Sequence, residues 1–403
     1  MPDTIMPKPR LHPLSAVAAG HLCLDIIPDL HRLQTGEFNR LFKPGRLIQT
    51  GAACFSTGGP VSNTGLALHR LGIHVKLNAK IGDDPFGKIV TELVARQDAD
   101  LTNGIVVDAQ VATSYTFIIN PPDVDRIFLH CTGANDAFDA GDVAYDLAAQ
   151  SRLFHFGYPP IMRQMYLNEG AELVEIMRRV KRGGTTTSLD LTFPDLSSES
   201  GRVNWRAILQ SVLPAVDIFL PSFEEVYFML HREAFEVLSA RGTLLEQVTP
   251  QMLSDLSREL LDMGVRIVVL KLGDRGLYVR TASEQLLRHM GFAGPANCAA
   301  WAGREIWSPC FAVSVVGTTG SGDATIAGFL SALLRGLSLE KSLRMAVAVG
   351  ACNVEAADAL SGLCSWENTL ARVASGWRQL PLTLHAPGWE WNEDQTLWFG
   401  PAL

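Results

Sequence analysis

The stretch VVGTTGSGDATIAGFL, residues 315–330, decides the fold because its glycine-rich turn runs directly into an amphipathic helix. Apolar residues at 326, 329, 330, 333 and 334 predict a helix that begins at or near Asp323. Gly320 and Gly322 can adopt positive φ without steric cost, so successive N–H groups can converge on one point. The free N–H groups and dipole of the helix favour an anion there. The segment therefore predicts an anion site with a carboxylate beside it.

Two familiar glycine loops do not fit this segment. The spacing of Gly317 and Gly322 imitates a nucleotide-binding P-loop, but that loop needs Lys and then Ser or Thr where Asp323 and Ala324 stand. A dinucleotide-binding loop is excluded because Thr325 occupies the third glycine position. Asp323 could instead orient an attacking hydroxyl and accept its proton in a phosphoryl transfer, or simply cap its helix. This segment alone leaves both interpretations open.

The composition favours a small-molecule ligand over a nucleic acid. The 403 residues carry a formal net charge of −8 and contain no long basic run. This length fits one large α/β domain or two smaller ones. The seven cysteines form no Cys-x-x-Cys pair, so we expect neither a zinc site nor a disulfide framework, but reduced thiols in a cytoplasmic protein.

The apolar stretch Leu14 to Gly20 could be read as the core of a signal peptide, since Lys8 and Arg10 precede it. The stretch is short, however, and His21 and Asp25 follow at once, which favours a first buried strand that ends at a site. No run of about eighteen apolar residues occurs anywhere, so we expect no segment that spans a membrane.

Short β-rich runs alternate with helical patterns along most of the chain. We expect strands at residues 15–19, 75–81, 115–119, 153–156, 186–191, 217–220, 265–270 and 311–315. We expect helices at residues 63–71, 86–96, 162–181, 205–213 and 251–263. This alternation predicts an α/β fold with a mostly parallel sheet covered on both faces. Ligands of such sheets bind beyond the carboxyl ends of the strands.

Two segments, residues 29–55 and 112–130, combine short strand-like runs with Pro or Gly breaks and lack a long helix. They could form a small β lid inserted into the larger domain, or ordinary surface hairpins. A lid would exclude water, which otherwise competes with an acceptor hydroxyl.

Polar and glycine positions recur near the predicted strand ends. Asp25 could accept hydrogen bonds from two vicinal hydroxyls, and the turn Gly58 to Asn63 would let a ligand approach the backbone. Glu225 opens the helix after the strand at 217–220 and could bind hydrated magnesium. The turn Lys271 to Gly276 could let a nucleotide lie against it. Each position also has an ordinary structural explanation, such as a solvated loop carboxylate or a favourable charge in a first helical turn.

These pieces, in this order, resemble the ribokinase-like (PfkB) carbohydrate kinases over roughly residues 14 to 375. The segment Thr318 to Asp323, with Gly328 and Phe329 behind it, carries the resemblance most strongly, and the segment Ile81 to Gly87 adds to it. The likeness implies a mostly parallel central sheet flanked by helices, with a small β lid. It assigns residues 1–380 to the kinase domain.

The resemblance also implies roles for individual residues. Asp323 would be the catalytic base, and the backbone of Gly320, Ser321 and Gly322 would form the anion hole. The substrate-binding positions would be Asp25, Gly58, Gly59 and Asn63, with Tyr115 and Arg126 near the lid. The nucleotide-side positions would be Lys271, Gly273, Gly276, Thr318 and Asn353, and Glu225 would serve magnesium.

The implied activity is transfer of the γ-phosphoryl group of Mg-ATP to a hydroxyl of a free sugar or sugar acid, as in fructokinase or ketodeoxygluconate kinase. A nucleoside kinase of the same fold and a non-catalytic sugar or nucleotide sensor are the alternatives. The likeness further implies a monovalent cation as a second cofactor and a homodimer, with neither nucleic acid nor membrane as a partner.

Four features depart from the family pattern or lie outside it. Ser222 stands where the family has Asn, and Gly317 stands where Asp is common, which affects the expected metal and phosphate contacts. Residues 284–309 form an insertion rich in Gly, Pro, Ala and Trp. Residues 381–403 form a tail with three tryptophans, which we expect to pack on the core.

Overall fold

The computed structural model describes residues 14–30, 42–121 and 127–401 of the chain. The predicted lid residue Arg126 and residues 31–41 of the predicted lid segment 29–55 lie outside the described residues. None of the described helices has the length and apolar character needed to cross a bilayer.

An eleven-stranded sheet forms the centre of the molecule, in the order β14-β15-β13-β12-β11-β10-β9-β8-β1-β4-β5. The parallel strands are β1 Leu14–Gly20, β4 Val75–Gly82, β5 Gly104–Asp108, β8 Ser151–Gly157, β9 Thr186–Leu189, β10 Ile218–Phe219 and β11 Ile267–Lys271. The antiparallel extension consists of β12 Leu277–Thr281, β13 Glu305–Ser308, β15 Leu397–Phe399 and β14 Glu390–Asn392. The predicted mostly parallel sheet is therefore confirmed.

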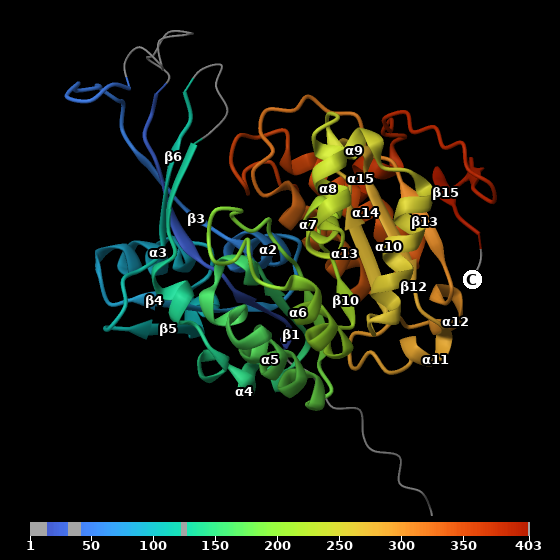
Figure 1. Cartoon of the computed structure of the whole chain (residues 1–403), viewed down its shortest axis with the longest axis horizontal. Coiled ribbons are helices and arrows are strands. Elements are labelled where there is room, and N and C mark those ends of the chain that lie inside the picture. Colours follow the sequence, from blue (N-terminus) through green and yellow to red (C-terminus); the bar gives the residue numbers. More distant parts are fainter. Residues whose placement is uncertain (1–13, 31–41, 122–126, 402–403) are drawn as a thin grey trace, which may run out of the picture.

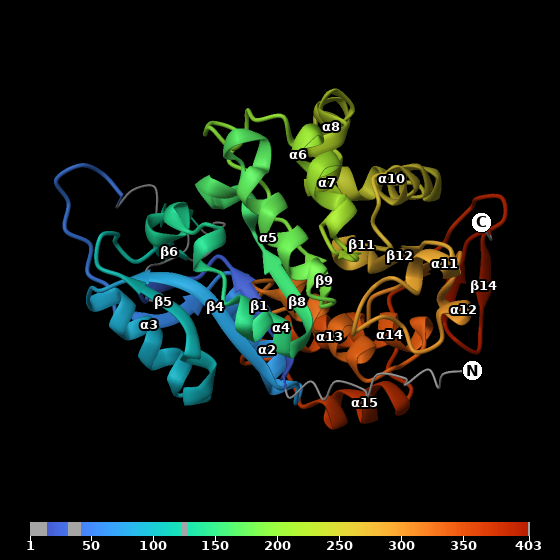
Figure 2. The ribbon, with the colours of Figure 1, turned by 90° about the horizontal axis from the view of Figure 1, so that it is seen from below.

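Helices cover both faces of this sheet, and Figure 2 shows the two layers on opposite sides of it. One layer contains α2 Pro60–Arg70, α3 Pro85–Ala95, α11 Glu284–Leu287, α12 Cys298–Trp301, α13 Ser321–Leu334, α14 Leu339–Asn353 and α15 Trp366–Ala374. The other contains α4 Tyr145–Gln150, α5 Ala171–Arg182, α6 Trp205–Val212, α7 Phe223–Leu230, α8 Arg232–Ser239, α9 Leu244–Gln247 and α10 Pro250–Asp262. In β1, Ala16 and Ala18 face the first layer while Val17 and Ala19 face the second. This alternation buries both faces of the strand.

A separate four-stranded sheet, in the order β3-β2-β6-β7, rises from one side of the molecule and forms the lid (Figure 1). Its strands are β2 Cys23–Ile27, β3 Cys54–Gly58, β6 Tyr115–Ile119 and β7 Ile127–Cys131. The lid strands β2 and β3 flank the predicted segment 29–55, and in its described part strand structure begins only at Cys54. The predicted β lid is thus present, but β2 ends before the segment 29–55 and β3 begins only at the end of it.

Two predicted elements are wrong in detail. The helix expected at 162–181 begins only at Ala171, because Asn168 and Glu169 have φ values of 49° and 56° and interrupt it. The strand expected at 311–315 is absent from the described structure, where Phe311 forms a single bridge to Gln379. Val315 remains 63% exposed, so its branched side chain packs on no sheet.

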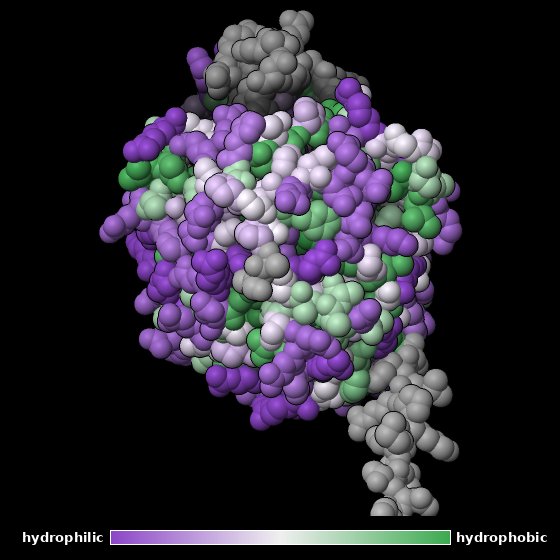
Figure 3. Space-filling view, turned by 90° about the vertical axis from the view of Figure 1, so that its right-hand side faces the viewer, coloured by the Kyte–Doolittle hydropathy of each residue, from purple (hydrophilic) through white to green (hydrophobic). Residues whose placement is uncertain are grey.

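The insertion 284–309 and the C-terminal tail meet at the edge of the large sheet. The insertion supplies α11, α12 and β13, and β15 of the tail pairs antiparallel with β13. Trp398 donates a hydrogen bond from Nε1 to the Leu382 carbonyl at 2.9 Å, and the ring of Trp389 lies beside those of Tyr278 and Trp307. On this side, the surface is largely hydrophilic and its apolar areas are interrupted by polar ones (Figure 3).

Candidate active site

Asp323 lies in the first turn of α13, directly after the glycine turn. Gly320 precedes the helix with a φ of 70°, a left-handed conformation that glycine adopts without strain. Gly322, in contrast, is already part of the helix and has no positive φ. A single left-handed glycine therefore suffices to turn the chain into α13. The N–H groups of this first turn have no acceptor within the helix itself.

The carboxylate of Asp323 is held by side chains from two other segments. Oδ2 accepts hydrogen bonds from Asn63 Nδ2 and from the Tyr158 hydroxyl, both at 3.0 Å, and Oδ1 accepts one from Thr64 Oγ1 at 3.2 Å. Asp323 is only 2% exposed, and Gly320 rather than Asp323 occupies the cap position of α13. Burial raises the pKa of Asp323, although Asn63 and Lys271 act to lower it. Asp323 is thus an oriented, buried carboxylate and not a helix cap.

On the lid side, the Asp25 side chain of β2 lies against Gly58, where the turn that leads to Asn63 begins. A methyl group on Gly58 would collide with Asp25 Oδ2, so a larger residue at this point of β3 would displace the Asp25 carboxylate. The Cys23 thiol donates a hydrogen bond to Asp25 Oδ1 at 3.5 Å. Burial raises the pKa of Asp25 to about 6, while Cys23 and Thr116 act to lower it. A carboxylate with this pKa can still be ionised at neutral pH.

The lid presents Thr116, and not the predicted Tyr115, to the site. Thr116 stands opposite Asp25 in the β2–β6 register, so both side chains lie on one face. Tyr115 points to the other face, where its ring packs against Phe86 and Phe117. Tyr115, predicted as a substrate-binding residue, therefore lies on the face of β6 away from Asp25, because successive side chains of a strand alternate between its faces.

Two histidines, which we had not predicted as site residues, join the core to the lid. His21 is 2% exposed, and its Nε2 lies 3.4 Å from Nε2 of His130 on β7. His130 Nδ1 lies 2.9 Å from Thr116 Oγ1. Burial and the neighbouring His130 lower the pKa of His21, so both rings are suited to neutral hydrogen bonding. A methyl group on Gly59 would lie 2.5 Å from His21 Nδ1, so this predicted substrate-side glycine packs directly on the ring.

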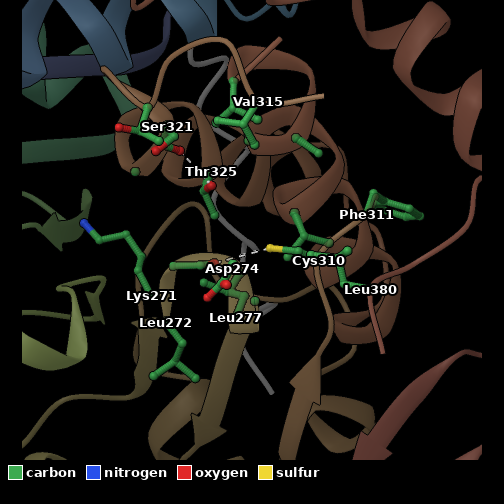
Figure 4. Close-up of a pocket in the computed structure, with 18 of the residues that line it drawn as sticks. Lys271, Leu272, Asp274, Leu277, Cys310, Phe311, Val315, Ser321, Thr325 and Leu380 are labelled. Atoms are coloured by element: carbon green, nitrogen blue, oxygen red, sulfur yellow. Dashed lines mark hydrogen bonds between the residues drawn. The ribbon is translucent and has the colours of Figure 1, made fainter. Parts of the chain in front are cut away.

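Two cavities border the glycine turn before α13. One, of about 370 Å³, lies on the lid side and is lined by residues that include Asp25, Thr57, Ile118, Thr319 and Ala359. The other, of about 360 Å³, is lined by Lys271, Gly273, Gly276, Thr318, Ser321 and Gly322 together with apolar side chains such as Leu277 and Val347. Figure 4 shows this second cavity with Lys271, Ser321 and Thr325 around it.

Most of the predicted nucleotide-side residues thus lie around one cavity. Asn353 is the exception, because it is not among the residues that line the cavity. Its Nδ2 instead donates a hydrogen bond to the Ala359 carbonyl at 2.6 Å. It ties the end of α14 to the loop that borders the lid-side cavity. Asn353 therefore contacts this loop and does not line the nucleotide-side cavity.

Lys271 ends β11 and enters a group of carboxylates. Its Nζ donates a hydrogen bond to Asp190 Oδ1 at 2.6 Å, and Asp190 directly follows β9. Burial acts to lower the pKa of Lys271, but the carboxylates of Asp190 and Glu225 raise it overall, so the ammonium stays charged. We had not predicted Asp190 as a site residue. Its position near the carboxyl end of the strand expected at residues 186–191 is the sequence feature that indicates a ligand site.

The two departures from the family pattern have local structural explanations. Ser222 caps α7, and Glu225 completes the capping box by accepting a hydrogen bond from the Ser222 N–H at 2.7 Å. Gly317 packs so closely on residues 356–357 that a methyl group would lie 2.9 Å from the Ala357 Cα. Within residues 14–30, 42–121 and 127–401, no three His, Cys, Asp or Glu side chains are grouped to hold a metal ion.

Known proteins resemble this chain over most of its length. A model of the pfkB family of carbohydrate kinases matches residues 15–365. An uncharacterized sugar kinase from Archaeoglobus fulgidus is 24% identical over 74% of this chain and 98% of its own, and maize fructokinase-1 is 22% identical over 86% and 94%.

Solved structures share the fold. A Xylella fastidiosa fructokinase with bound ATP superposes with a TM-score of 0.65 and 18% identity, covering 90% of this chain and 98% of its own. Arabidopsis thaliana ribokinase complexed with ribose and ATP gives a TM-score of 0.64 and 19% identity, covering 89% and 98%. The match of the family model across nearly the whole chain, on the ribokinase-like fold described above, places this protein in the pfkB family of carbohydrate kinases, which are phosphotransferases that act on an alcohol group.

Proposed function

We propose that this kinase transfers the γ-phosphoryl group of ATP to a hydroxyl of a free sugar or sugar acid, with Asp323 as the general base. The position of Asp323 carries the proposal. It follows a turn whose residues line both cavities, since Thr318 and Ser321 border one and Thr319 borders the other. A donor on one side and an acceptor on the other would therefore meet beside this carboxylate.

The bond changes of this step balance without a further reactant. The acceptor oxygen forms a bond to the γ-phosphorus, and the bond between that phosphorus and the β–γ bridging oxygen breaks. ADP leaves with the electron pair, and the hydroxyl proton goes to Asp323. The N–H groups at the start of α13 would donate hydrogen bonds to the transferred group and stabilise its negative charge. Late proton transfer suits a carboxylate, because the attacking hydroxyl keeps its proton until the new bond is well advanced.

Magnesium fits the charge distribution of the site. Asp190 Oδ2 is buried and has no hydrogen-bond partner among the described residues, and the nearby Glu225 is a second carboxylate that interacts with Lys271. Hydrated magnesium binds through few protein carboxylates and through phosphates, which such a site allows. When bound, the ion would neutralise phosphate charge, and Glu225 would be its protein-side anchor.

The acceptor would bind between the lid and the core. Asp25, at the lid-side cavity, can accept hydrogen bonds from two vicinal hydroxyls, as expected for recognition of a sugar. Asn63 is buried beside Asp323, and its Oδ1 has no partner among the described residues, so it remains available to a hydroxyl. These groups support a polyol as the acceptor.

A nucleoside acceptor is the second candidate, because the lid-side cavity also has apolar walls. Ile27, Phe55 and Ile118 line it together with Asp25. A ribose could then bind to Asp25 while its base packs against these side chains.

We also propose a homodimer formed through the lid in the cytoplasm. On β7, Ile127 is 38% and Leu129 54% exposed, which leaves apolar surface for a second copy. All seven cysteines are free thiols, which suits a reducing compartment. Light scattering would show a mass twice that of the chain, and a monomer at micromolar concentration would contradict the dimer.

Coupled ADP release across hexoses, ketoses, sugar acids, pentoses and nucleosides tests the proposed function. Wild type and Asp323→Asn are measured side by side, so that background ATP hydrolysis and contaminating kinases are recognised. Turnover of a sugar or sugar acid by wild type alone supports the proposal, whereas selective turnover of nucleosides supports the second candidate. No turnover of any acceptor, with ATP or a sugar still bound in calorimetry, would identify a sensor instead.

A further inference from the structure

Lys271 lies among three carboxylates that come from separate segments of the chain. Asp190 follows β9 and accepts its hydrogen bond at 2.6 Å. Glu225 in α7 and Asp323 in α13 both interact electrostatically with the same ammonium group. Lys271 is therefore the common cationic neighbour of the general base, of the proposed magnesium anchor and of Asp190.

The ammonium of Lys271 has hydrogen-bond donors left for a ligand on the nucleotide side. It brings positive charge to this group of carboxyls, to which a bound triphosphate would add further negative charge. A lysine ammonium carries three N–H donors. Only the bond to Asp190 is a hydrogen bond of Lys271 Nζ within the described residues, so further donors remain for a phosphoryl oxygen.

The position of the ammonium relative to α13 supports this role. A methyl group on Gly322 would lie 3.6 Å from Lys271 Nζ, so the lysine side chain lies against the first turn of the helix. The N–H groups of that turn form the anion site proposed above. An anion held there would meet the ammonium as well, and Lys271 also lines the cavity on the nucleotide side.

We infer that Lys271 contacts the transferred phosphoryl group, and that Asp190 is the positioning residue that holds the lysine in place. This inference rests on the proposed function and adds a catalytic cation to it. While the acceptor oxygen bonds to the γ-phosphorus and the bond to the bridging oxygen breaks, Lys271 stabilises the negative charge on the transferred group. It keeps its own proton, since the hydroxyl proton goes to Asp323.

A matched pair of lysine variants tests the inference. Lys181 donates a hydrogen bond to Asp217 at 2.5 Å, so the chain contains a second partly buried lysine–aspartate pair, at the opposite end of the sheet. Lys271→Met should lower kcat about 10²- to 10³-fold, the usual cost of removing one group that stabilises transition-state charge. Lys181→Met should lower the melting temperature but leave kcat of the folded enzyme unchanged.

A binding measurement separates catalysis from folding. ADP with aluminium fluoride imitates the transferred phosphoryl group, and for wild type with sugar and magnesium it should raise the melting temperature beyond ADP alone. Lys271→Met should keep the ADP shift and lose the additional one. A variant that retains the additional shift together with wild-type kcat would overturn the inference.

Asp190→Asn provides a second route if Lys271→Met does not melt cooperatively. Loss of the charge that holds the ammonium should lower kcat and the aluminium fluoride shift while leaving the affinity for ADP near that of wild type. If Asp190→Asn changes only the melting temperature, Asp190 is structural and the inference fails. Absence of turnover by wild type would instead contradict the proposed function, so the two failures are distinguishable.

Discussion

Each end of the parallel sheet contains a lysine–aspartate pair, but the two aspartates differ in whether both of their carboxylate oxygens have hydrogen-bond partners. At the amino end of β10, Asp217 accepts hydrogen bonds from Lys181 on Oδ1 and from Thr187 on Oδ2. At the carboxyl end of β9, Asp190 is held by Lys271 through Oδ1, while Oδ2 has no partner within the described residues. A fully bonded buried carboxylate contributes to folding, whereas one with a free oxygen at a strand's carboxyl end is available to a ligand.

We expect the largest effect on kcat from a substitution at the carboxyl end of the parallel sheet. Asp323→Asn should lower kcat about 10²- to 10⁴-fold, because it removes the proposed general base, with little change in the KM for sugar. Since burial raises the pKa of Asp323, the neutral amide should not lower the melting temperature. Steady-state kinetics and calorimetry on the same preparation measure both quantities. If Asp323→Asn loses stability but keeps its turnover, Asp323 serves folding, and the proposed difference between the two ends of the sheet is contradicted.

The opposite result is expected at the amino end. Asp217→Ala leaves the ammonium of Lys181 without its partner, and loss of one member of a buried pair costs about 3 kcal/mol or more. Urea unfolding should therefore show a lower free energy of unfolding, while kcat of the folded fraction stays at the wild-type value. A fall in kcat as large as that of Asp323→Asn would show that both ends serve catalysis.

A moderate effect, dependent on pH, is expected from Asp25. Its pKa is about 6 in the folded chain, so the carboxylate loses its charge as the pH falls below 6. The sugar KM of wild type should rise over that range, and Asp25→Asn should raise it about tenfold or more at pH 8 while removing the pH dependence. A profile of KM from pH 5 to pH 8 measures both; the same profile for wild type and variant would exclude Asp25 from substrate binding.

The same titration has a consequence for stability. Because the pKa of Asp25 is higher in the folded than in the unfolded chain, the folded chain binds the proton more tightly. Its contribution to the free energy of unfolding therefore falls as the pH rises from about 4 to about 6. Asp25→Asn should remove this part of the pH dependence.

The smallest effect is expected from Thr64, which donates a hydrogen bond to the proposed base Asp323 and would contact no reacting atom. Thr64→Val removes the hydrogen bond to Asp323 Oδ1, which typically contributes about 1 kcal/mol and so about a fivefold change in kcat. Thr369→Val is the matched control, since buried Thr369 bonds to the Ser365 carbonyl in α15. An equal loss of kcat in both variants would mean that the effect is general destabilisation.

The fold could be predicted from sequence because the alternation of strands and helices is a local pattern repeated many times. The predictions that were wrong depend on long-range contacts or on backbone geometry. Residues 311–315 have strand propensity, yet the sheet offers them no partner because the insertion supplies β13 to that edge. At Asn168 and Glu169 the chain adopts a left-handed conformation that a helical pattern does not reveal.

The site was predictable where its residues are contiguous. The turn before Asp323 forms one segment, so its glycines and its carboxylate could be recognised together. Tyr158 and Asp190 reach the site from distant segments as single side chains, with no local signal beyond their place near a strand end. Thr64 directly follows the predicted Asn63. The choice between Tyr115 and Thr116 depends on the register of β6 against β2, which lie about ninety residues apart and are paired only in the fold.

The three donors on Asp323 limit how an acceptor hydroxyl could approach this carboxylate. A carboxylate has about four lone-pair positions, and Asn63 and Tyr158 together use those of Oδ2. Thr64 uses one position of Oδ1 and leaves one for the acceptor. A sugar that offers several chemically similar hydroxyls should therefore give a single phosphate ester, which phosphorus NMR of the product would show as one resonance. The selection of one hydroxyl would in this way follow from the hydrogen bonds that already occupy most of the Asp323 carboxylate.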